Sequence, residues 1–116
     1  MFSLTSSQRY YLYRQPADMR KSFDGLSGLV LQQMKRDPLS GDVYMFLSKR
    51  KDRVKLLRWE PGGFVLYYKR LEEGTLAMPE GIWEGETRQV SWPELVLLIE
   101  GIIIEKYQQN KRYKVA

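Results

Sequence analysis

Hydrophobic and polar positions alternate along three runs in the middle of the chain. Residues 43–48, 53–60 and 64–71 are rich in β-branched and aromatic side chains. A basic loop at 49–52 separates the first two runs, and Pro61, Gly62 and Gly63 separate the last two. Proline presets φ and glycine permits a positive φ, so the second connection is a tight turn. The pattern predicts a three-stranded antiparallel meander.

A further strand is predicted near the start of the chain. Residues 9–15 contain three tyrosines and end at Pro16, which cannot continue a strand ladder. If this strand lies at an unpaired edge of the sheet, it offers a pairing surface for a second copy of the chain. A homo-oligomer is therefore one expectation.

A helix is predicted over residues 19–34, with Asp18 as its candidate N-cap. One face of this helix carries Phe23, Leu26, Val30 and Met34. Gly25 and Gly28 interrupt the pattern, and each costs roughly 1 kcal/mol relative to alanine in a helix. They indicate close packing of the helix on the sheet, or alternatively a break near Gly28.

The C-terminal third predicts an extended segment at 82–90 and a second helix after it. Ser91 and Glu94 have the spacing of a capping box, and Val90 can pack on Leu95. The predicted buried face of this helix comprises Trp92, Leu95, Val96, Ile99 and Ile102 or Ile103. Residues 105–116 are expected to be a charged tail that is frayed or disordered.

These elements predict one domain over residues 1–104. With 116 residues, the chain has room for a core of two layers. The expected fold class is α+β, an antiparallel β-meander sheet of about three to five strands packed against two helices.

The composition excludes several kinds of chemistry. The sequence has no cysteine and no histidine, so it has no disulfide, no Cys/His zinc site and no catalytic Cys or His. No glycine-rich phosphate loop is present, and we expect no cofactor. The N-terminus is too polar for a signal peptide, and the longest apolar run, 95–104, is too short for a membrane span. We therefore expect a cytoplasmic protein without a membrane partner.

A carboxylate site for metal ions is the remaining enzymatic alternative. Such a site needs several convergent acids. The acids here fall at predicted turns and caps without a spaced motif: Asp18, Asp24, Asp37, Asp42, Asp52 and Glu60. We therefore expect no enzyme, no metal site and no catalytic residue.

Positive charge is concentrated at one place in the sequence. The net charge is +5, and residues 49–58 alone hold six basic residues and one acid. The basic and acidic residues of the rest of the chain are therefore equal in number. This asymmetry predicts a polyanion partner, DNA or RNA. The candidate phosphate contacts are Lys49, Arg50, Lys51, Arg53, Lys55 and Arg58, extended by Lys69 and Arg70. The alternative is a solvated hairpin that is basic for solubility.

Aromatic residues accompany these cations. In the predicted strands neither face is purely apolar, so we expect one face to cover the core and the other to expose cations and rings together. Trp59 and Tyr68 are the candidates for stacking on bases, although such rings also serve as core residues in small domains. Arg20 and Lys21 are candidates for a secondary phosphate contact, or alternatively for surface salt bridges with nearby acids.

Three segments together resemble a known family. They are PADMRKSFDGLSGLV, then DPLSGDVYMFLSKRKDRVKLLRWEPGGFVLYYKRLEEGT, and finally SWPELVLLIEGI. Over residues 14–102 the chain resembles the small accessory protein, called TnpB or the second open reading frame product, of IS66-type bacterial insertion sequences. This is not the RNA-guided nuclease of the same name. Only Ala77 and Met78 look less typical of the pattern.

The resemblance implies a non-catalytic role in transposition. The family's recurrent residues correspond here to Asp18, Met19, Arg20, Phe23, Gly25, Leu26, Phe46, Arg50, Lys55, Leu57, Trp59, Gly62, Phe64, Lys69, Arg70, Leu71 and Gly74. The partners it suggests are DNA, as element ends or a transposition intermediate, and the element's transposase and other accessory protein. In the alternative, the protein docks on the transposase without binding DNA.

Overall fold

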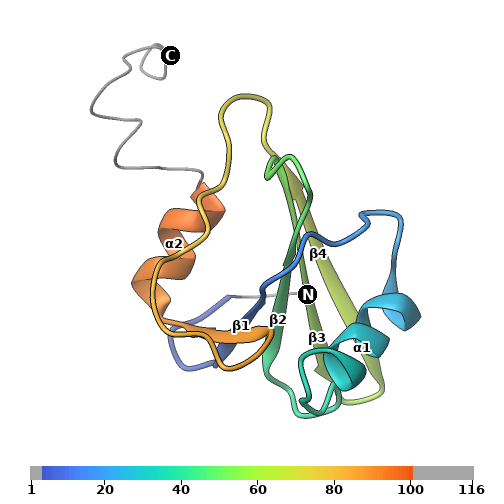
Figure 1. The fold of residues 1–116 in the computed structure, drawn as a ribbon. Coiled ribbons are helices and arrows are strands. Elements are labelled where there is room, and N and C mark those ends of the chain that lie inside the picture. Colours follow the sequence, from blue (N-terminus) through green and yellow to red (C-terminus); the bar gives the residue numbers. More distant parts are fainter. Residues whose placement is uncertain (1–3, 101–116) are drawn as a thin grey trace.

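The computed structural model describes residues 4–100, which form five strands and two helices (Figure 1). In chain order they are β1 (Tyr10–Tyr13), α1 (Phe23–Gln32), β2 (Val43–Leu47), β3 (Arg53–Glu60), β4 (Gly63–Arg70), β5 (Thr87–Val90) and α2 (Trp92–Glu100). The predicted α+β class is confirmed. The predicted tail at 105–116, like Ile102 and Ile103, lies outside the described residues.

The strands form one sheet in the order β4-β3-β2-β1-β5. The predicted meander is confirmed, because β2 pairs antiparallel with β3 and β3 with β4. The two-residue turn between β3 and β4 has Gly62 at a φ of 96°, which glycine adopts without strain. One pair, β1 with β2, is parallel, so the sheet is mixed. A parallel connection needs a crossover, and α1 supplies it.

Strand β1 lies inside the sheet, not at its edge. It pairs with β2 on one side and β5 on the other, and all four of its residues are buried. The expectation that this segment forms an unpaired edge was therefore wrong. The two edges of the sheet are β4 and β5.

The two helices cover opposite faces of the sheet (Figure 1). Helix α2 packs through Leu95, Leu98 and Ile99 on a cluster that includes Leu12, Met45 and Leu56. Helix α1 packs through Leu26 and Val30 on the other face, where the cluster comprises Tyr11, Tyr13, Ala17, Met34, Tyr44, Phe46 and Leu57. The expectation that one sheet face stays open was wrong, since both faces carry a buried apolar cluster.

Helix α1 begins at Phe23, four residues later than predicted, with Ser22 as its N-cap residue. Asp18 instead caps a preceding turn, in which its Oδ1 accepts the Arg20 backbone N–H at 2.9 Å. The helix passes through Gly28 without a break. A Cβ at Gly25 would lie 3.1 Å from the Lys21 Cβ, so the close packing at that glycine is against Lys21 rather than the sheet.

Helix α2 begins with the predicted capping box. The Ser91 N–H donates to Glu94 Oε1 at 2.9 Å, and the Glu94 N–H donates to Ser91 Oγ at 3.3 Å. Arg88 of β5 adds an ion pair of 2.8 Å, and its hydrogen bonds lower the pKa of Glu94. Val96 was predicted to be buried but is 38% exposed, because the buried stripe follows Leu95, Leu98 and Ile99.

We predict that Ser91→Ala lowers the free energy of unfolding by about 1 kcal/mol, as for other lost N-caps. Urea unfolding measures this change.

Because the folded-state pKa of Glu94 lies below its usual value of 4.5, the ionised Glu94 contributes its full stabilisation of the folded protein above that value. It is lost as the pH falls through the folded-state pKa. Glu94→Gln should therefore reduce the acid sensitivity of unfolding below about pH 4.5 in urea titrations.

The control is Glu73→Gln, which removes an exposed loop carboxylate. An identical pH profile for Glu94→Gln and the unchanged protein would contradict this role of Glu94.

Candidate nucleic-acid interface

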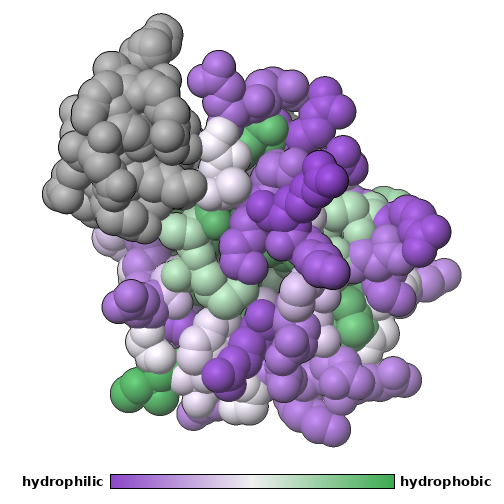
Figure 2. All heavy atoms as spheres, turned by 45° about the horizontal axis from the view of Figure 1, so that its top comes forward, coloured by the Kyte–Doolittle hydropathy of each residue, from purple (hydrophilic) through white to green (hydrophobic). Residues whose placement is uncertain are grey.

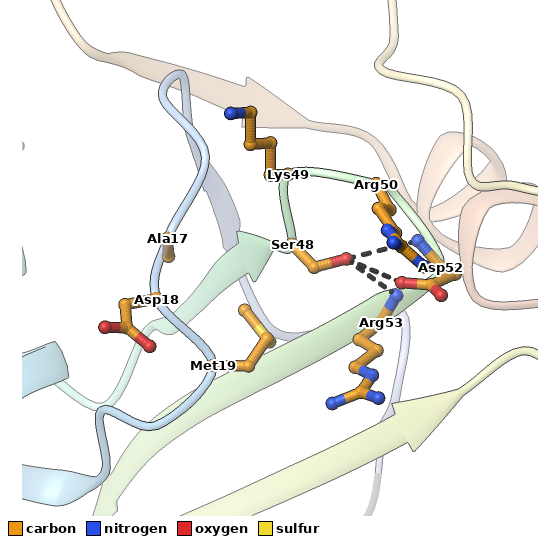
Figure 3. A pocket seen from close by; sticks show the side chains of 8 residues that line it. All are labelled: Ala17, Asp18, Met19, Ser48, Lys49, Arg50, Asp52 and Arg53. Carbon is orange, nitrogen blue, oxygen red and sulfur yellow. Dashed lines mark hydrogen bonds between the residues drawn. The ribbon is translucent and has the colours of Figure 1, made fainter.

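The basic loop between β2 and β3 is held in one conformation by Ser48. Its hydroxyl donates to Asp52 Oδ1 at 3.0 Å and accepts the N–H groups of Asp52 and Arg53 at 3.2 and 3.0 Å (Figure 3). Lys51 takes a left-handed φ of 59°, which closes the turn. Sequence reasoning missed Ser48, although a serine four residues before an aspartate in a short loop was the available signal.

The same loop is anchored to the chain that follows β4. The Lys51 carbonyl accepts the Leu76 N–H at 2.6 Å, and the Asp52 carbonyl accepts the Leu71 N–H at 2.7 Å. Leu76 is buried in the cluster beneath α2. These bonds tie the basic loop to the core, so its side chains project from a fixed backbone.

Four cations at this hairpin tip have no acidic partner. Lys49 and Arg50 are exposed, and Lys51 and Arg53 are half-buried. None of the four forms an ion pair within residues 4–100, and the Asp52 carboxylate accepts the Ser48 hydroxyl instead. Figure 2, in which this end of the molecule comes forward, shows hydrophilic side chains gathered across the face. The tip therefore carries a net positive charge, with these four cations against the single acid Asp52.

A shallow pocket of about 360 Å³ lies between the hairpin tip and the segment that follows β1 (Figure 3). It is lined by Ala17, Asp18, Met19, Ser48, Lys49, Arg50, Asp52 and Arg53. The Ala17 N–H donates to the Leu47 carbonyl at 2.9 Å, which fixes the facing wall. Three of the four tip cations thus share a concave surface.

Lys55 is buried in the fold, with 5% of its surface exposed. Its Nζ donates to the carbonyls of Met19 and Lys21 at 2.7 and 2.8 Å and lies 4.6 Å from the centre of the Tyr68 ring. This ammonium group holds the pocket wall against β3. It is not presented to a phosphate, in contrast to the role predicted from its place in the basic run.

Lys69 and Arg58 are also engaged within the protein. Lys69 points to the opposite face, where its Nζ donates to the Ile99 carbonyl in the last turn of α2 at 2.8 Å. Arg58 lies 3.5 Å from Glu60 at the far end of β3. Neither side chain joins the hairpin tip, because strand alternation and strand length separate them from it.

Arg70 does lie beside the tip, directly across the β3–β4 pair from Arg53. Its Nε donates to Glu72 at 2.9 Å, and both side chains are more than half exposed. An exposed pair of this kind contributes little and is readily exchanged for another anion.

The two candidate stacking rings lie far apart. Tyr68 is 49% exposed, and its hydroxyl accepts Arg53 Nη1 at 3.3 Å. Trp59 packs edge-on against Phe64 with ring centres 5.0 Å apart. It lies six residues along β3 from Arg53, roughly 20 Å away. Only Tyr68 accompanies the tip cations.

Arg20 and Lys21 follow the pocket wall. Arg20 Nη2 lies 2.8 Å from Asp18 Oδ2, and the hydrogen bonds from Arg20 hold the pKa of Asp18 well below its usual range. The Arg20 charge is therefore matched by Asp18, as in the salt-bridge alternative. Lys21 has an exposed side chain, and its backbone carbonyl accepts a hydrogen bond from Lys55 Nζ.

Among residues 4–100, no three acids come together in a group that could hold a metal ion. In the same part of the chain, neither helix is long and apolar enough to cross a membrane.

Comparison with known proteins identifies the family. The family model described as IS66 Orf2 like protein matches residues 8–109. The chain belongs to this IS66 Orf2-like family. It is 34% identical over 94 residues to the uncharacterized protein y4jC of Sinorhizobium fredii, which covers 81% of this chain and 79% of that protein. It is 33% identical over 86 residues to y4hO of the same organism, covering 73% and 72%. No solved structure matches.

Membership confirms the predicted resemblance to the second open reading frame product of IS66-type elements. It supports an accessory role in transposition for this IS66 Orf2-like protein. The family description names no ligand or partner, so what this protein binds is inferred from its structure.

We predict that Lys55→Met destabilises the protein by roughly 1–3 kcal/mol, because it leaves the buried carbonyls of Met19 and Lys21 without a donor. Lys49→Met, the same change at an exposed tip position, should alter the free energy of unfolding by less than about 0.5 kcal/mol. Urea unfolding measures both. Equal effects of the two substitutions would show that the Lys55 contacts contribute nothing to stability.

Proposed function

We propose that this IS66 Orf2-like protein binds DNA during transposition, through phosphate contacts made by the β2–β3 hairpin tip. The observation that carries the proposal is the set of four cations without acidic partners on a loop fixed by Ser48. They are Lys49, Arg50, Lys51 and Arg53. A fixed loop loses little conformational entropy when it binds, so its charges are already in place for phosphates.

The proposed contact set is smaller than the basic run. The four tip cations form it, and Arg70 joins them by exchanging Glu72 for a phosphate. Lys55, Lys69 and Arg58 are left out because their side chains contact carbonyl or carboxylate groups of the protein. Four or five phosphates are therefore neutralised, and log K should fall with log salt at a slope of roughly −3.5 to −4.5 on duplex DNA and about −3 to −3.5 on single strands.

Tyr68 gives the surface a means of contact with bases. One side of its ring faces the Lys55 ammonium, and nearly half of the residue is exposed beside Arg53. A ring in this position can stack on an unpaired base while the adjacent guanidinium contacts the backbone. Single-stranded DNA or a transposition intermediate with unpaired ends is the form that uses both groups.

In this proposal the protein performs no chemical step. Residues 4–100 contain no cluster of acids for metal-assisted cleavage, and the chain has no His or Cys. Strand transfer belongs to the element's transposase, and the accessory protein holds DNA for it. The basic tip is then occupied by DNA rather than by an acidic surface of the transposase.

We predict that the purified protein binds labelled element-end DNA with the stated salt slope. Reversing Lys49, Arg50, Lys51 and Arg53 to glutamate should abolish binding and the slope together, since the electrostatic term is removed. Fluorescence anisotropy across a salt series on duplex, single-stranded and scrambled DNA measures both affinity and specificity.

Single substitutions provide a matched control. Lys49→Glu and Lys35→Glu change the net charge equally, but Lys35 follows α1 near β5, since the Met34 carbonyl accepts Thr87 Oγ1. Lys49→Glu should weaken binding about tenfold, and Lys35→Glu only slightly. Absence of binding to every DNA at low salt would overturn the proposal and favour docking on the transposase.

A further inference from the structure

The two edges of the sheet differ in length. Strand β5, at one edge, has four residues, whereas β4, at the other, has eight. Strand β4 pairs with β3 without interruption and contains no proline. A long, regular edge strand is a template for pairing with another strand, and proteins usually shorten, bend or charge such edges. Here only the last two residues, Lys69 and Arg70, are charged.

The register identifies the backbone groups that face outward. The Leu71 N–H donates to the Asp52 carbonyl, so Leu71 and Asp52 form a hydrogen-bonded pair in the same register. Hydrogen-bonded pairs alternate along an antiparallel ladder. The residues of β4 that use their N–H and C=O groups toward β3 are therefore Gly63, Val65, Tyr67 and Lys69. Those that point these groups outward are Phe64, Leu66, Tyr68 and Arg70.

The bonding of β3 agrees with this assignment. Arg53, which lies opposite Arg70, directs its carbonyl to the Ser48 N–H on the β2 side instead. No backbone partner for the outward groups of β4 occurs among residues 4–100.

We propose that β4 pairs antiparallel with β4 of a second copy of this chain, with the two-fold axis at Tyr67. The two five-stranded sheets then become one continuous sheet of ten strands. In this register Phe64 lies opposite Arg70 of the second copy, and Leu66 lies opposite Tyr68. All four outward-facing residues of each strand find hydrogen-bonding partners, which no shifted two-fold register achieves within β4.

The charges of β4 favour this occupant and this direction. In the antiparallel pair, Lys69 lies opposite Val65 of the second copy, and Arg70 opposite Phe64, so no like charges meet. A parallel pair in register would place Lys69 and Arg70 beside their own copies, which is destabilising. The second copy also supplies a partner strand of matching length, rich in the aromatic and β-branched residues that pair well. Strand β4 is self-complementary.

The dimer forms through the backbone edge of β4 and does not use the four tip cations, although Tyr68 and Arg70 of β4 also belong to the proposed DNA surface. Its two basic tips lie at opposite ends of the joined strands, because the strands run antiparallel. Failure of DNA binding would therefore leave the dimer intact, and failure of the dimer would leave DNA binding by a single tip.

The first test is sedimentation of the full chain, which should be a dimer. Leu66→Pro removes an outward N–H without removing a β3–β4 hydrogen bond, and it should weaken dimerisation about 30-fold or more. Leu66→Ala shortens the same side chain but keeps the N–H, so it is the matched control and should weaken the dimer much less. Circular dichroism checks that both variants fold. A monomeric unchanged protein, or equal dissociation constants for the two variants, would overturn the proposal.

The second test reads the register. The chain has no cysteine, so each substitution adds a single thiol. Tyr67→Cys places two thiols opposite each other at the two-fold axis, in a non-hydrogen-bonded pair whose Cα atoms are about 4.5 Å apart. That distance suits a disulfide. In Leu66→Cys each thiol lies opposite Tyr68 of the second copy, so the two thiols are offset by two residues along the strands.

Mild oxidation should link Tyr67→Cys into a covalent dimer much faster than Leu66→Cys. Preferential linkage of Leu66→Cys, or linkage of neither variant, would contradict the register.

Discussion

Burial of the central strands on both faces is the constraint on which the rest of this structure depends. With α1 on one face and α2 on the other, every polar group that enters the middle of β2 or β3 needs a partner inside the protein. Lys55 meets this requirement with two carbonyls and an aromatic ring. Its contacts join β3 to the segment before α1, so the residue that satisfies the constraint also positions the wall of the basic pocket.

The same constraint sorts the candidate cations of β3, β4 and the hairpin tip into two groups. Within the covered part of the sheet, Lys55 and Lys69 donate to carbonyls at a loop and at a helix end. Four cations lie beyond the part of the sheet that the helices cover, and none has an acidic partner in the described chain: Lys49, Arg50, Lys51 and Arg53. The cations without acidic partners therefore gather at the hairpin tip, where the backbone is held by Ser48 rather than by the sheet.

The two edges of the sheet also differ in length and in how the chain continues from them. At one side the chain ends the sheet with the short strand β5, which leads into the capped start of α2. At the other side β4 leaves a full strand of outward backbone groups. The protein thus has a positively charged hairpin tip at one end and a long edge strand, β4, at one side of the sheet.

The sequence alone determined the elements whose signals are local. The meander, the turn at Gly62 and the capping box of Ser91 and Glu94 all follow from period-two alternation, turn chemistry and helix-start spacing, which act over a few residues. It also determined the family and the location of the excess charge. It did not determine the start of α1, because the Asp18 carboxylate caps a turn as readily as a helix.

Tertiary structure decided which strands are neighbours and which cations are available. The parallel pairing of β1, between β2 and β5, depends on contacts between residues distant in the chain. Whether Lys55 faces solvent or a carbonyl depends on the segment 17–21 folding over β3, which no alternation pattern in β3 encodes. Charge is a property of the sequence, but its availability is set by what the fold places against it.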